Sequence, residues 1–288
     1  MTPTAVGRDR TSDDAGGGPV GHGAAEDVGS SHTRGASIEV SGLTVRYAAA
    51  ASAGEPHQGT LAIDDISFRV RPKEIVVIVG PSGCGKSTLL KAVAGLLRPS
   101  RGSVRVIQPE AAAPRVGFVF QSDALLPWRT AVQNVELAVR LTGESSRVAG
   151  ARAAHLMREL GLGDSCDKYP AQLSGGMRKR VALARALAYE PAVFLMDEPF
   201  SALDANTRIH VGNFFLRIVE RFGQSVVFVT HDIDEAVALG DRILVLSRGP
   251  GRLIGTFDVA LPRPRDYYKS RFEDGFRELQ KRVFDLIG

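Results

Sequence analysis

The sequence has few of the features that mark secreted, metal-binding or membrane-spanning proteins. It holds two cysteines, Cys84 and Cys166, which form no metal-ligand pattern and favour a reduced, cytosolic setting. No run of residues approaches the roughly 18 consecutive apolar positions that a membrane-spanning helix needs. The N-terminus also lacks the apolar core of a signal peptide. We therefore expect a protein that is neither secreted nor membrane-spanning.

An excess of charge of one sign is also missing. The formal net charge is +4, and no basic stripe carries interleaved aromatic residues, so we expect no nucleic-acid partner. The apolar fraction of 44% and the charged fraction of 24% are those of an ordinary globular protein. A chain of 288 residues can bury a full core, either as one large domain or as a domain with a small subdomain.

The order of apolar and polar residues predicts an α/β protein. Residues 1–36 contain almost no large apolar side chains, so we expect a disordered N-terminal tail. Alternation predicts strands at 38–47 and 63–70, with a loose loop at 48–59 between them. From residue 75 onward, short buried strands alternate with helices, which predicts a mainly parallel sheet covered on both faces. These strands are expected at residues 75–79, 116–120, 192–196, 226–230 and 243–246.

Two segments that do not follow this alternation indicate a helical subdomain and a C-terminal extension. Helical patterns at 130–141 and 146–160 follow each other without a strand, so the block 122–173 indicates an inserted helical subdomain. Near the C-terminus, apolar residues at near-helical spacing predict that 265–288 form a helical extension packed on the body. These apolar residues are Phe272, Phe276, Leu279, Val283 and Leu286.

A phosphate-binding loop follows the first buried strand. Residues 80–87 match G-x-x-x-x-G-K-[ST] between a strand and a helix, where this pattern must stand. Lys86 would place a charge on the transferring phosphoryl group, and the Ser87 hydroxyl would ligate Mg²⁺. Cys84 is either a small residue at a tolerant position or a redox switch. The expected nucleotide-binding residues are Gly80, Pro81, Ser82, Gly83, Cys84, Gly85, Lys86, Ser87 and Thr88.

Two further segments carry chemistry. The apolar strand at 192–196 ends in Asp197 and Glu198, and its burial does not explain the paired acids, because unpaired buried carboxylates are costly. Asp197 fits a second-sphere carboxylate for Mg²⁺, and Glu198 fits the base that polarises attacking water. Before them, Ser174, Gly175 and Gly176 stand at a helix start that favours an anion. The chain thus has two phosphate-binding surfaces but one P-loop.

Over residues 38–264 these motifs resemble the ATP-binding subunit of an ABC transporter. The segment 173–177 resembles the family signature, and 201–204 is similar to its D-loop. Gln121 resembles the glutamine of the Q-loop, and His231 the switch histidine. The resemblance implies an ABC ATPase domain over 37–264, with a P-loop NTPase fold that has a mainly parallel core sheet, an antiparallel β subdomain and an inserted helical subdomain.

The resemblance also implies a role for each matching residue. Gln121 would contact Mg²⁺ with Ser87 and Asp197, and His231 would hydrogen-bond the γ-phosphate and position water. The catalytic residues would be Glu198, His231 and Lys86. Tyr47 is placed like the aromatic residue that stacks on adenine, although the long loop after it leaves a mere packing role open. For Gln121 and His231 the alternatives are an ordinary surface glutamine and a loop histidine.

Met177 narrows the resemblance, because the signature usually has glutamine at this place. Methionine resembles the branch of importers for nitrate, sulfonates and taurine, as do residues 125–130 and 261–265. Trp128, within the first of these segments, is alternatively a core residue of the helical subdomain.

The family implies a head-to-tail dimer in which each ATP lies between the P-loop of one subunit and the signature of the other. We expect ATP hydrolysis that drives separate transmembrane permease subunits at the cytoplasmic face of the membrane, with an extracytoplasmic solute-binding protein. The alternatives are an exporter subunit, or a non-transport ABC ATPase that acts on DNA or ribosomes.

Overall fold

The computed structural model describes residues 36–48, 59–108 and 115–287, which belong to one compact unit. The tail expected over 1–36 lies outside the described residues except for Ala36, and most of the loop expected at 48–59 lies outside them too. Ala36 is buried, and its carbonyl accepts a hydrogen bond of 2.6 Å from the Ser225 hydroxyl. In the described segments, no helix combines the length and the apolar character that crossing a membrane requires.

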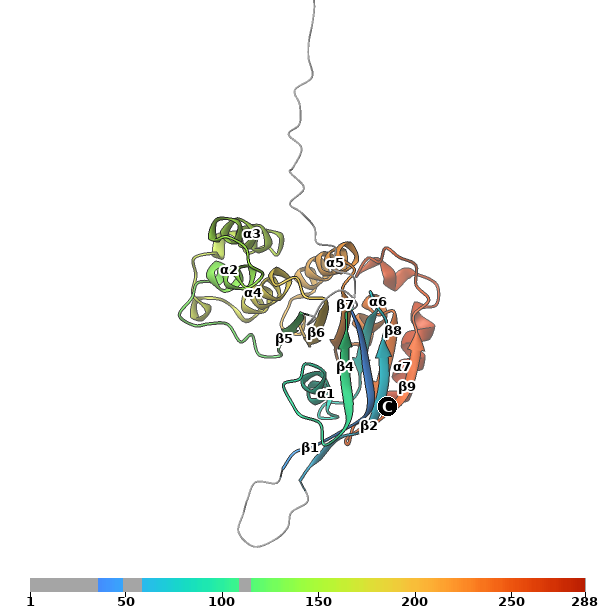
Figure 1. The fold of residues 1–288 in the computed structure, drawn as a ribbon. Helices are drawn as coiled ribbons and strands as arrows, with labels where there is room; N and C mark the ends of the chain where they lie inside the picture. Colours follow the sequence, from blue (N-terminus) through green and yellow to red (C-terminus); the bar gives the residue numbers. More distant parts are fainter. Residues whose placement is uncertain (1–35, 49–58, 109–114, 288) are drawn as a thin grey trace, which may run out of the picture. The chain divides into compact units, whose positions relative to one another are not determined.

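The smaller of two sheets is antiparallel, with the strand order β2-β1-β4 (Figure 1). Val40 of the central strand pairs with Phe68 on one side and with Val104 on the other. The third strand was not expected, because its residues are exposed or half-buried and form no apolar run. The strands are β1 (Ser37–Arg46), β2 (Leu61–Val70) and β4 (Arg101–Ile107).

The larger sheet has six strands in the order β5-β6-β7-β3-β8-β9. Neighbouring strands run parallel except β8 and β9, which pair antiparallel. The last strand was not expected from the sequence either, since none of its residues is fully buried. The strands are β3 (Ile75–Val79), β5 (Val116–Val119), β6 (Val193–Asp197), β7 (Ser225–Val229), β8 (Arg242–Leu246) and β9 (Leu253–Asp258).

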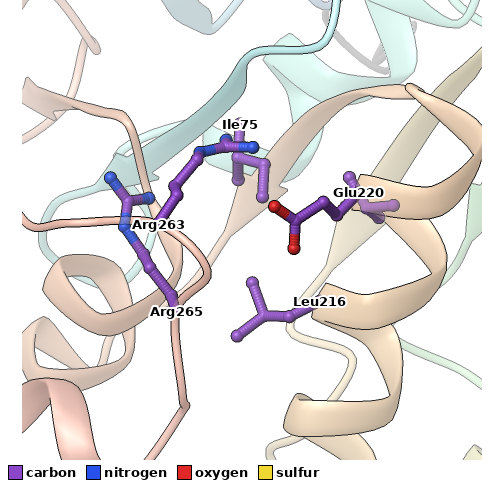
Figure 2. A pocket seen from close by; sticks show the side chains of 6 residues that line it. Ile75, Leu216, Glu220, Arg263 and Arg265 are labelled. Carbon is purple, nitrogen blue, oxygen red and sulfur yellow. The ribbon is translucent and has the colours of Figure 1, made fainter.

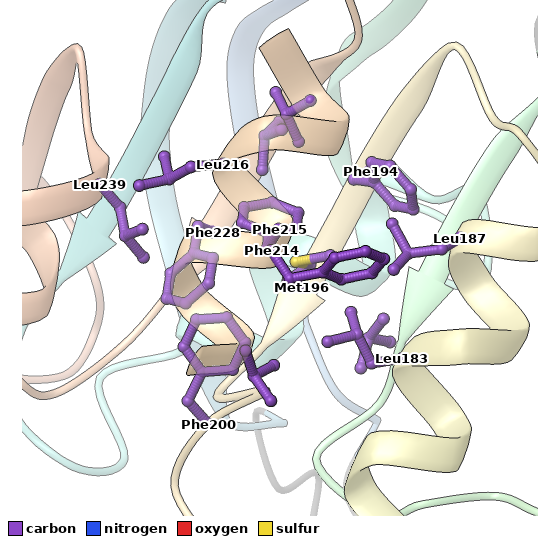
Figure 3. Close-up of a cluster of buried hydrophobic side chains, with 14 of the residues drawn as sticks. Leu183, Leu187, Phe194, Met196, Phe200, Phe214, Phe215, Leu216, Phe228 and Leu239 are labelled. Atoms are coloured by element: carbon purple, nitrogen blue, oxygen red, sulfur yellow. The ribbon is translucent and has the colours of Figure 1, made fainter. Parts of the chain in front are cut away.

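The central strands are buried on both faces, which explains their continuous apolar runs. Along β3, Val77 belongs to one core cluster, while Val76 and Ile78 belong to the other. Aromatic rings fill the first cluster, where Phe200 and Phe228 lie 5.5 Å apart between ring centroids (Figure 3). Each such buried side chain contributes about 1.5–3 kcal/mol to folding.

Helices cover the larger sheet. Four of these helices begin at a residue whose side chain caps the helix N-terminus. Thr130, Ser174, Asp204 and Asp232 each accept a hydrogen bond from a backbone amide in the first turn of the helix that follows. The helices are α1 (Lys86–Val93), α2 (Ala131–Arg140), α3 (Ser146–Glu159), α4 (Gly175–Ala188), α5 (Ala205–Phe222), α6 (Ile233–Leu239) and α7 (Phe276–Ile287).

Helices α2 and α3 follow each other without a strand and pack against α4 (Figure 1). Val135 and Met157 are fully buried in this group of helices. Trp128, just before α2, is 71% exposed, so the alternative that places it in the helical core is wrong.

The C-terminal helix α7 packs on α6, β8 and β9. Phe276, Leu279 and Val283 are its buried residues, as their spacing predicted. Leu286 and Phe272 were wrongly included in this stripe: Leu286 is 38% exposed, and Phe272 lies before the helix and is 73% exposed. Gly275, with a φ of 84°, separates it from the first turn of α7.

Candidate nucleotide site

The P-loop leaves the buried strand β3 and enters α1 through Gly85. Gly85 has a φ of 100°, and a Cβ atom there would lie 2.7 Å from the carbonyl oxygen of Ala62. Only glycine fits this conformation and this contact. No side chain caps α1 among the described residues, so its first backbone N–H groups are available to a phosphate.

Lys86 is held beneath this loop. Its ammonium group donates hydrogen bonds to the carbonyls of Gly80 at 2.7 Å and Pro81 at 2.8 Å, and the residue is buried. The Cys84 sulfur lies 3.9 Å from the same nitrogen and is buried in the core cluster between the sheets. Cys84 therefore packs behind the loop, while Lys86 concentrates positive charge at it.

Tyr47 reaches the same place from the end of β1. Its hydroxyl lies 3.0 Å from the hydroxyl of Thr88 in α1, and its backbone N–H donates to Thr60 across the hairpin. The tyrosine is 42% exposed, so it is not a core residue. The long loop after Tyr47 does not separate it from the P-loop helix.

The surroundings of Asp197 fit a hard divalent cation. Asp197 ends β6 and is 3% exposed, and its Oδ1 has no hydrogen-bond partner in the described part of the chain. Burial raises the pKa of Asp197, and a hydrogen bond from the Ser87 hydroxyl opposes that rise. An unpartnered carboxylate oxygen beside a hydroxyl is a donor set that Mg²⁺ prefers.

A cation at this place would need further oxygen ligands. Within the residues that the structure describes, no group of three or more His, Cys, Asp and Glu side chains could hold a metal ion. Phosphate oxygens of a bound nucleotide supply the missing ligands in sites of this kind, where Mg²⁺ binds through one or two protein groups.

Glu198 and His231 meet at the carboxyl ends of adjacent parallel strands. Asp197 of β6 pairs with Val229 of β7, so the residues that follow the two strands lie side by side. His231 Nδ1 is 3.2 Å from Glu198 Oε1. Glu198 has a φ of 48°, which is rare for a residue with a side chain, and backbone strain of this kind is found at functional sites.

A small cavity of about 40 Å³ adjoins this pair, and it is large enough for water. Sequence reasoning did not find two of its charged residues, Arg208 and Glu235, because folding alone brings them there. Its lining is Glu198, Phe200, Ser201, Arg208, Thr230, His231, Asp232 and Glu235.

Gln121 is exposed in the segment after β5, and a lysine of α4 ties its backbone down. Lys179 donates hydrogen bonds to the carbonyls of Gln121 and Phe120 and is 3% exposed. Burial lowers the pKa of Lys179, and the nearby charge of Asp123 opposes this. Sequence reasoning missed Lys179, although a lysine one turn before the buried Ala182 and Leu183 of the same helix was a usable signal.

The signature segment begins α4. Ser174 caps the helix, with its hydroxyl accepting a hydrogen bond of 3.3 Å from the Met177 amide. A Cβ atom on Gly176 would lie 3.2 Å from the carbonyl oxygen of Ala202 in the D-loop segment. Across the described ranges, no hydrogen bond or ion pair joins residues 174–176 to the P-loop of the same chain.

The parallel sheet, the P-loop between β3 and α1, and the carboxylates at the end of β6 define the class of this protein. It is a P-loop nucleoside triphosphatase.

Comparisons with known proteins identify the family. The model of the family described as ABC transporter matches residues 63–201. Nitrate transport protein NasD of Klebsiella oxytoca is 38% identical over 87% of this chain and 95% of its own length. Aliphatic sulfonates import ATP-binding protein SsuB 2 of Burkholderia lata is 44% identical over 76% of this chain and 82% of its own.

Comparison with solved structures supports the same family. The dimeric post-hydrolysis structure of the ATP-binding cassette MJ0796, bound to ADP and Pi, is similar with a TM-score of 0.68. It is 31% identical and covers 77% of this chain and 98% of that one. This chain belongs to the ABC transporter family, and it is an ATP-binding, ATP-hydrolysing subunit. The predicted family and the predicted fold class are confirmed.

Proposed function

We propose that this subunit hydrolyses ATP to drive import of a small anion or organic solute, of the nitrate, sulfonate or taurine kind. The proposal is carried by its relatives, whose names describe nitrate transport and sulfonate import and which match it over most of their length. The same likeness disfavours an exporter subunit and a non-transport ATPase.

The P-loop would bind the β- and γ-phosphates of ATP. Lys86, already held at the loop, would turn its ammonium group toward the γ-phosphate, and the amides at the start of α1 would donate to phosphate oxygens. Tyr47 would stack on adenine beside Thr88. Ser87, Asp197 and Gln121 would hold Mg²⁺, which neutralises charge on the phosphates when bound.

Glu198 and His231 would act on the attacking water. Glu198 would accept its proton, and its carboxylate is held within 3.2 Å of the His231 ring. His231 would hydrogen-bond the γ-phosphate and orient the water against it. The two roles need both side chains at one edge of the sheet, and the pairing of β6 with β7 supports that arrangement.

A second copy of the chain would complete each site. Ser174, Gly175 and Gly176 would donate to the ATP held by the P-loop of the partner, in a head-to-tail dimer of two-fold symmetry. The dimeric cassette bound to ADP and Pi supports this assembly. ATP binding would close the dimer, and hydrolysis would reopen it.

The surface near Gln121 and Trp128 would contact separate transmembrane permease subunits at the cytoplasmic face of the membrane. The exposure of Trp128 supports a contact outside the chain. The ATPase domain would span 37–264, with its helical subdomain at about 122–173, a disordered tail at 1–36 and a helical extension at 265–288. An extracytoplasmic solute-binding protein would deliver the solute.

Purification of the tagged full-length chain from its native membranes tests this proposal. We expect an integral membrane subunit to copurify, and we expect the complex to show ATPase activity that a candidate solute with its binding protein stimulates. Recovery of the chain on ribosomes or DNA, without any membrane subunit, would contradict the importer assignment.

A further inference from the structure

Helix α6 follows residues 230–232, here called the histidine segment because they include His231. Both ends of this helix are fixed by side chains. At its start, the Asp232 carboxylate accepts a hydrogen bond of 3.1 Å from the Glu235 amide. At its end, the Arg265 guanidinium donates to the carbonyls of Leu239 at 3.0 Å and Gly240 at 2.6 Å. A cation on the last carbonyls of a helix also interacts favourably with the helix dipole.

Arg265 belongs to a C-terminal segment, residues 261–267, which follows β9 and contacts Asp241 just before β8. The Arg265 side chain is 4% exposed and forms an ion pair with Asp241 at 3.1 Å. Arg263 forms an ion pair with the same carboxylate at 2.5 Å. Asp241 in turn accepts from the Ile75 amide at the start of β3. Both arginines line a small cavity together with Ile75 and Glu220 (Figure 2).

The last residue of this segment, Tyr267, is buried between α5 and α6. It is 1% exposed, and a Cβ atom on Gly212 would come within 2.5 Å of its ring, so α5 approaches it closely. Its amide donates to Asn213 Oδ1 at 2.6 Å, and its ring meets Phe200 edge-on at 6.2 Å. The backbone and ring are therefore fixed without any contribution from the hydroxyl group.

That hydroxyl group reaches the catalytic region. The Tyr267 O–H donates to Glu235 Oε1 at 3.0 Å, and Glu235 is 4% exposed. Glu235 lines the same small cavity as Glu198 and His231, and its carboxylate also accepts from the Thr230 hydroxyl. Thr230 is the residue directly before His231. The hydrogen bonds from Tyr267 to Glu235 and from Thr230 to Glu235 therefore connect Tyr267 to the histidine segment.

We propose that Tyr267 is a positioning residue for ATP hydrolysis, which through its hydrogen bond to Glu235 holds His231 in place against Glu198. The proposal rests on the roles proposed above for His231 and Glu198. It gives the segment 261–267 a purpose beyond packing: Arg265 fixes the end of α6, and Tyr267 fixes its start.

The competing explanation is that Tyr267 only fills the core. The two explanations differ in what the hydroxyl group does, because the ring alone satisfies the packing against Gly212 and Phe200. Loss of the Tyr267 hydroxyl would leave the P-loop unchanged, because the hydrogen bonds from this hydroxyl lead through Glu235 to the histidine segment and not to the P-loop. A positioning role therefore predicts a change in kcat without a matching change in KM for ATP.

The test uses the purified full-length chain and the variant Tyr267→Phe, with Tyr268→Phe as the matched control. Tyr268 is the next residue and is 44% exposed. We expect Tyr267→Phe to lower kcat about fivefold, with KM for ATP changed less than about twofold, as the loss of one hydrogen bond allows. Tyr268→Phe should leave both constants at the wild-type values.

A double-mutant cycle isolates the contact. If the bond between the two side chains carries the effect, Tyr267→Phe in a Glu235→Ala background should lower kcat no further than Glu235→Ala alone. Independent losses that multiply would overturn the proposal. Equal kcat values for Tyr267→Phe and Tyr268→Phe would overturn it too.

Amide hydrogen exchange gives a measurement that does not depend on turnover. Tyr267→Phe should speed exchange at residues 230–239 and leave residues 80–88 at the wild-type rate. Unchanged exchange at 230–239 would contradict the positioning role. Failure of the proposed function would instead appear as normal ATP turnover in a Glu198→Gln variant, while this exchange result could still stand.

Discussion

Two helices of this chain begin at glycine-rich segments, α1 and α4, and their surroundings differ. At α1, no side chain caps the helix among the described residues, and Lys86 and Ser87 supply charge and a hydroxyl. At α4, Ser174 uses its hydroxyl to cap the helix, and the nearby Arg178 is engaged by Asp123 at 3.0 Å. The first helix start can bind a nucleotide with groups of its own chain. Under the proposed function, the second would add donors to a nucleotide that another subunit holds.

The largest effect is expected at Glu198, the proposed base beside the α1 site. Glu198→Gln removes the proton acceptor and keeps the shape, so kcat should fall about 10³-fold while ATP binding stays intact. ATP should then hold two α4 segments against two P-loops, which size-exclusion chromatography with ATP detects as a stable dimer. Normal turnover in this variant would show that Glu198 is not the base.

The two helix starts should respond differently to substitution. Lys86→Ala removes a charge-assisted contact to phosphate, so ATP affinity of the isolated chain should fall roughly 10- to 100-fold. Ser174→Arg should leave that affinity unchanged and abolish both dimer formation and turnover. Equilibrium binding of a fluorescent ATP analogue, with analytical ultracentrifugation, measures both. Equal losses of affinity in the two variants would remove the distinction between the helix starts.

Glu235, at the same edge of the sheet, should make stability depend on pH. Burial raises its pKa from 4.5 to about 7 in the folded protein. A carboxyl group with a raised folded pKa stabilises fully below its unfolded pKa, and this contribution is lost as the pH rises through 7. Relative to Glu235→Gln, the wild type should lose about 3 kcal/mol of unfolding free energy between pH 4.5 and pH 8.

Urea unfolding of both proteins across this pH range gives the comparison, because the other ionisable groups are shared. Parallel pH dependences for the wild type and Glu235→Gln would show that the carboxyl group is not perturbed by burial.

The smallest effect concerns Tyr47, which belongs to the α1 site alone. Tyr47→Ala should raise KM for ATP roughly tenfold by removing a stacking surface. Tyr47→Phe keeps the ring and loses the contact with Thr88, so KM should rise only about twofold. Steady-state kinetics at several ATP concentrations separates the two variants. An unchanged KM in Tyr47→Ala would favour the packing role.

The elements that a local motif or a periodic apolar pattern determines could be predicted from the sequence alone. The P-loop, the buried strands around it and the apolar face of α7 follow from motif and spacing, as Leu279 and Val283 illustrate. Strand β4 was missed because Arg101 and Arg105 are exposed, so its pairing with β1 leaves no apolar run to read.

Contacts between distant segments could not be predicted. Lys179 reaches Gln121 across 58 positions, and Tyr267 reaches Glu235 across 32. Such pairs depend on how the strands and helices pack, because neither residue carries a local signal for its partner.

The central claim is that one active site needs the P-loop of one chain and the α4 start of another. Mixing Lys86→Ala with Ser174→Arg tests it most directly, since each variant alone has no complete site. A mixed dimer joins the intact P-loop of the Ser174→Arg chain to the intact α4 start of the Lys86→Ala chain. Because each mixed dimer has one complete site of two, mixing equal amounts should restore turnover, at most to about half of the wild-type ATPase sites. No recovery on mixing, with normal turnover by Ser174→Arg alone, would contradict the account.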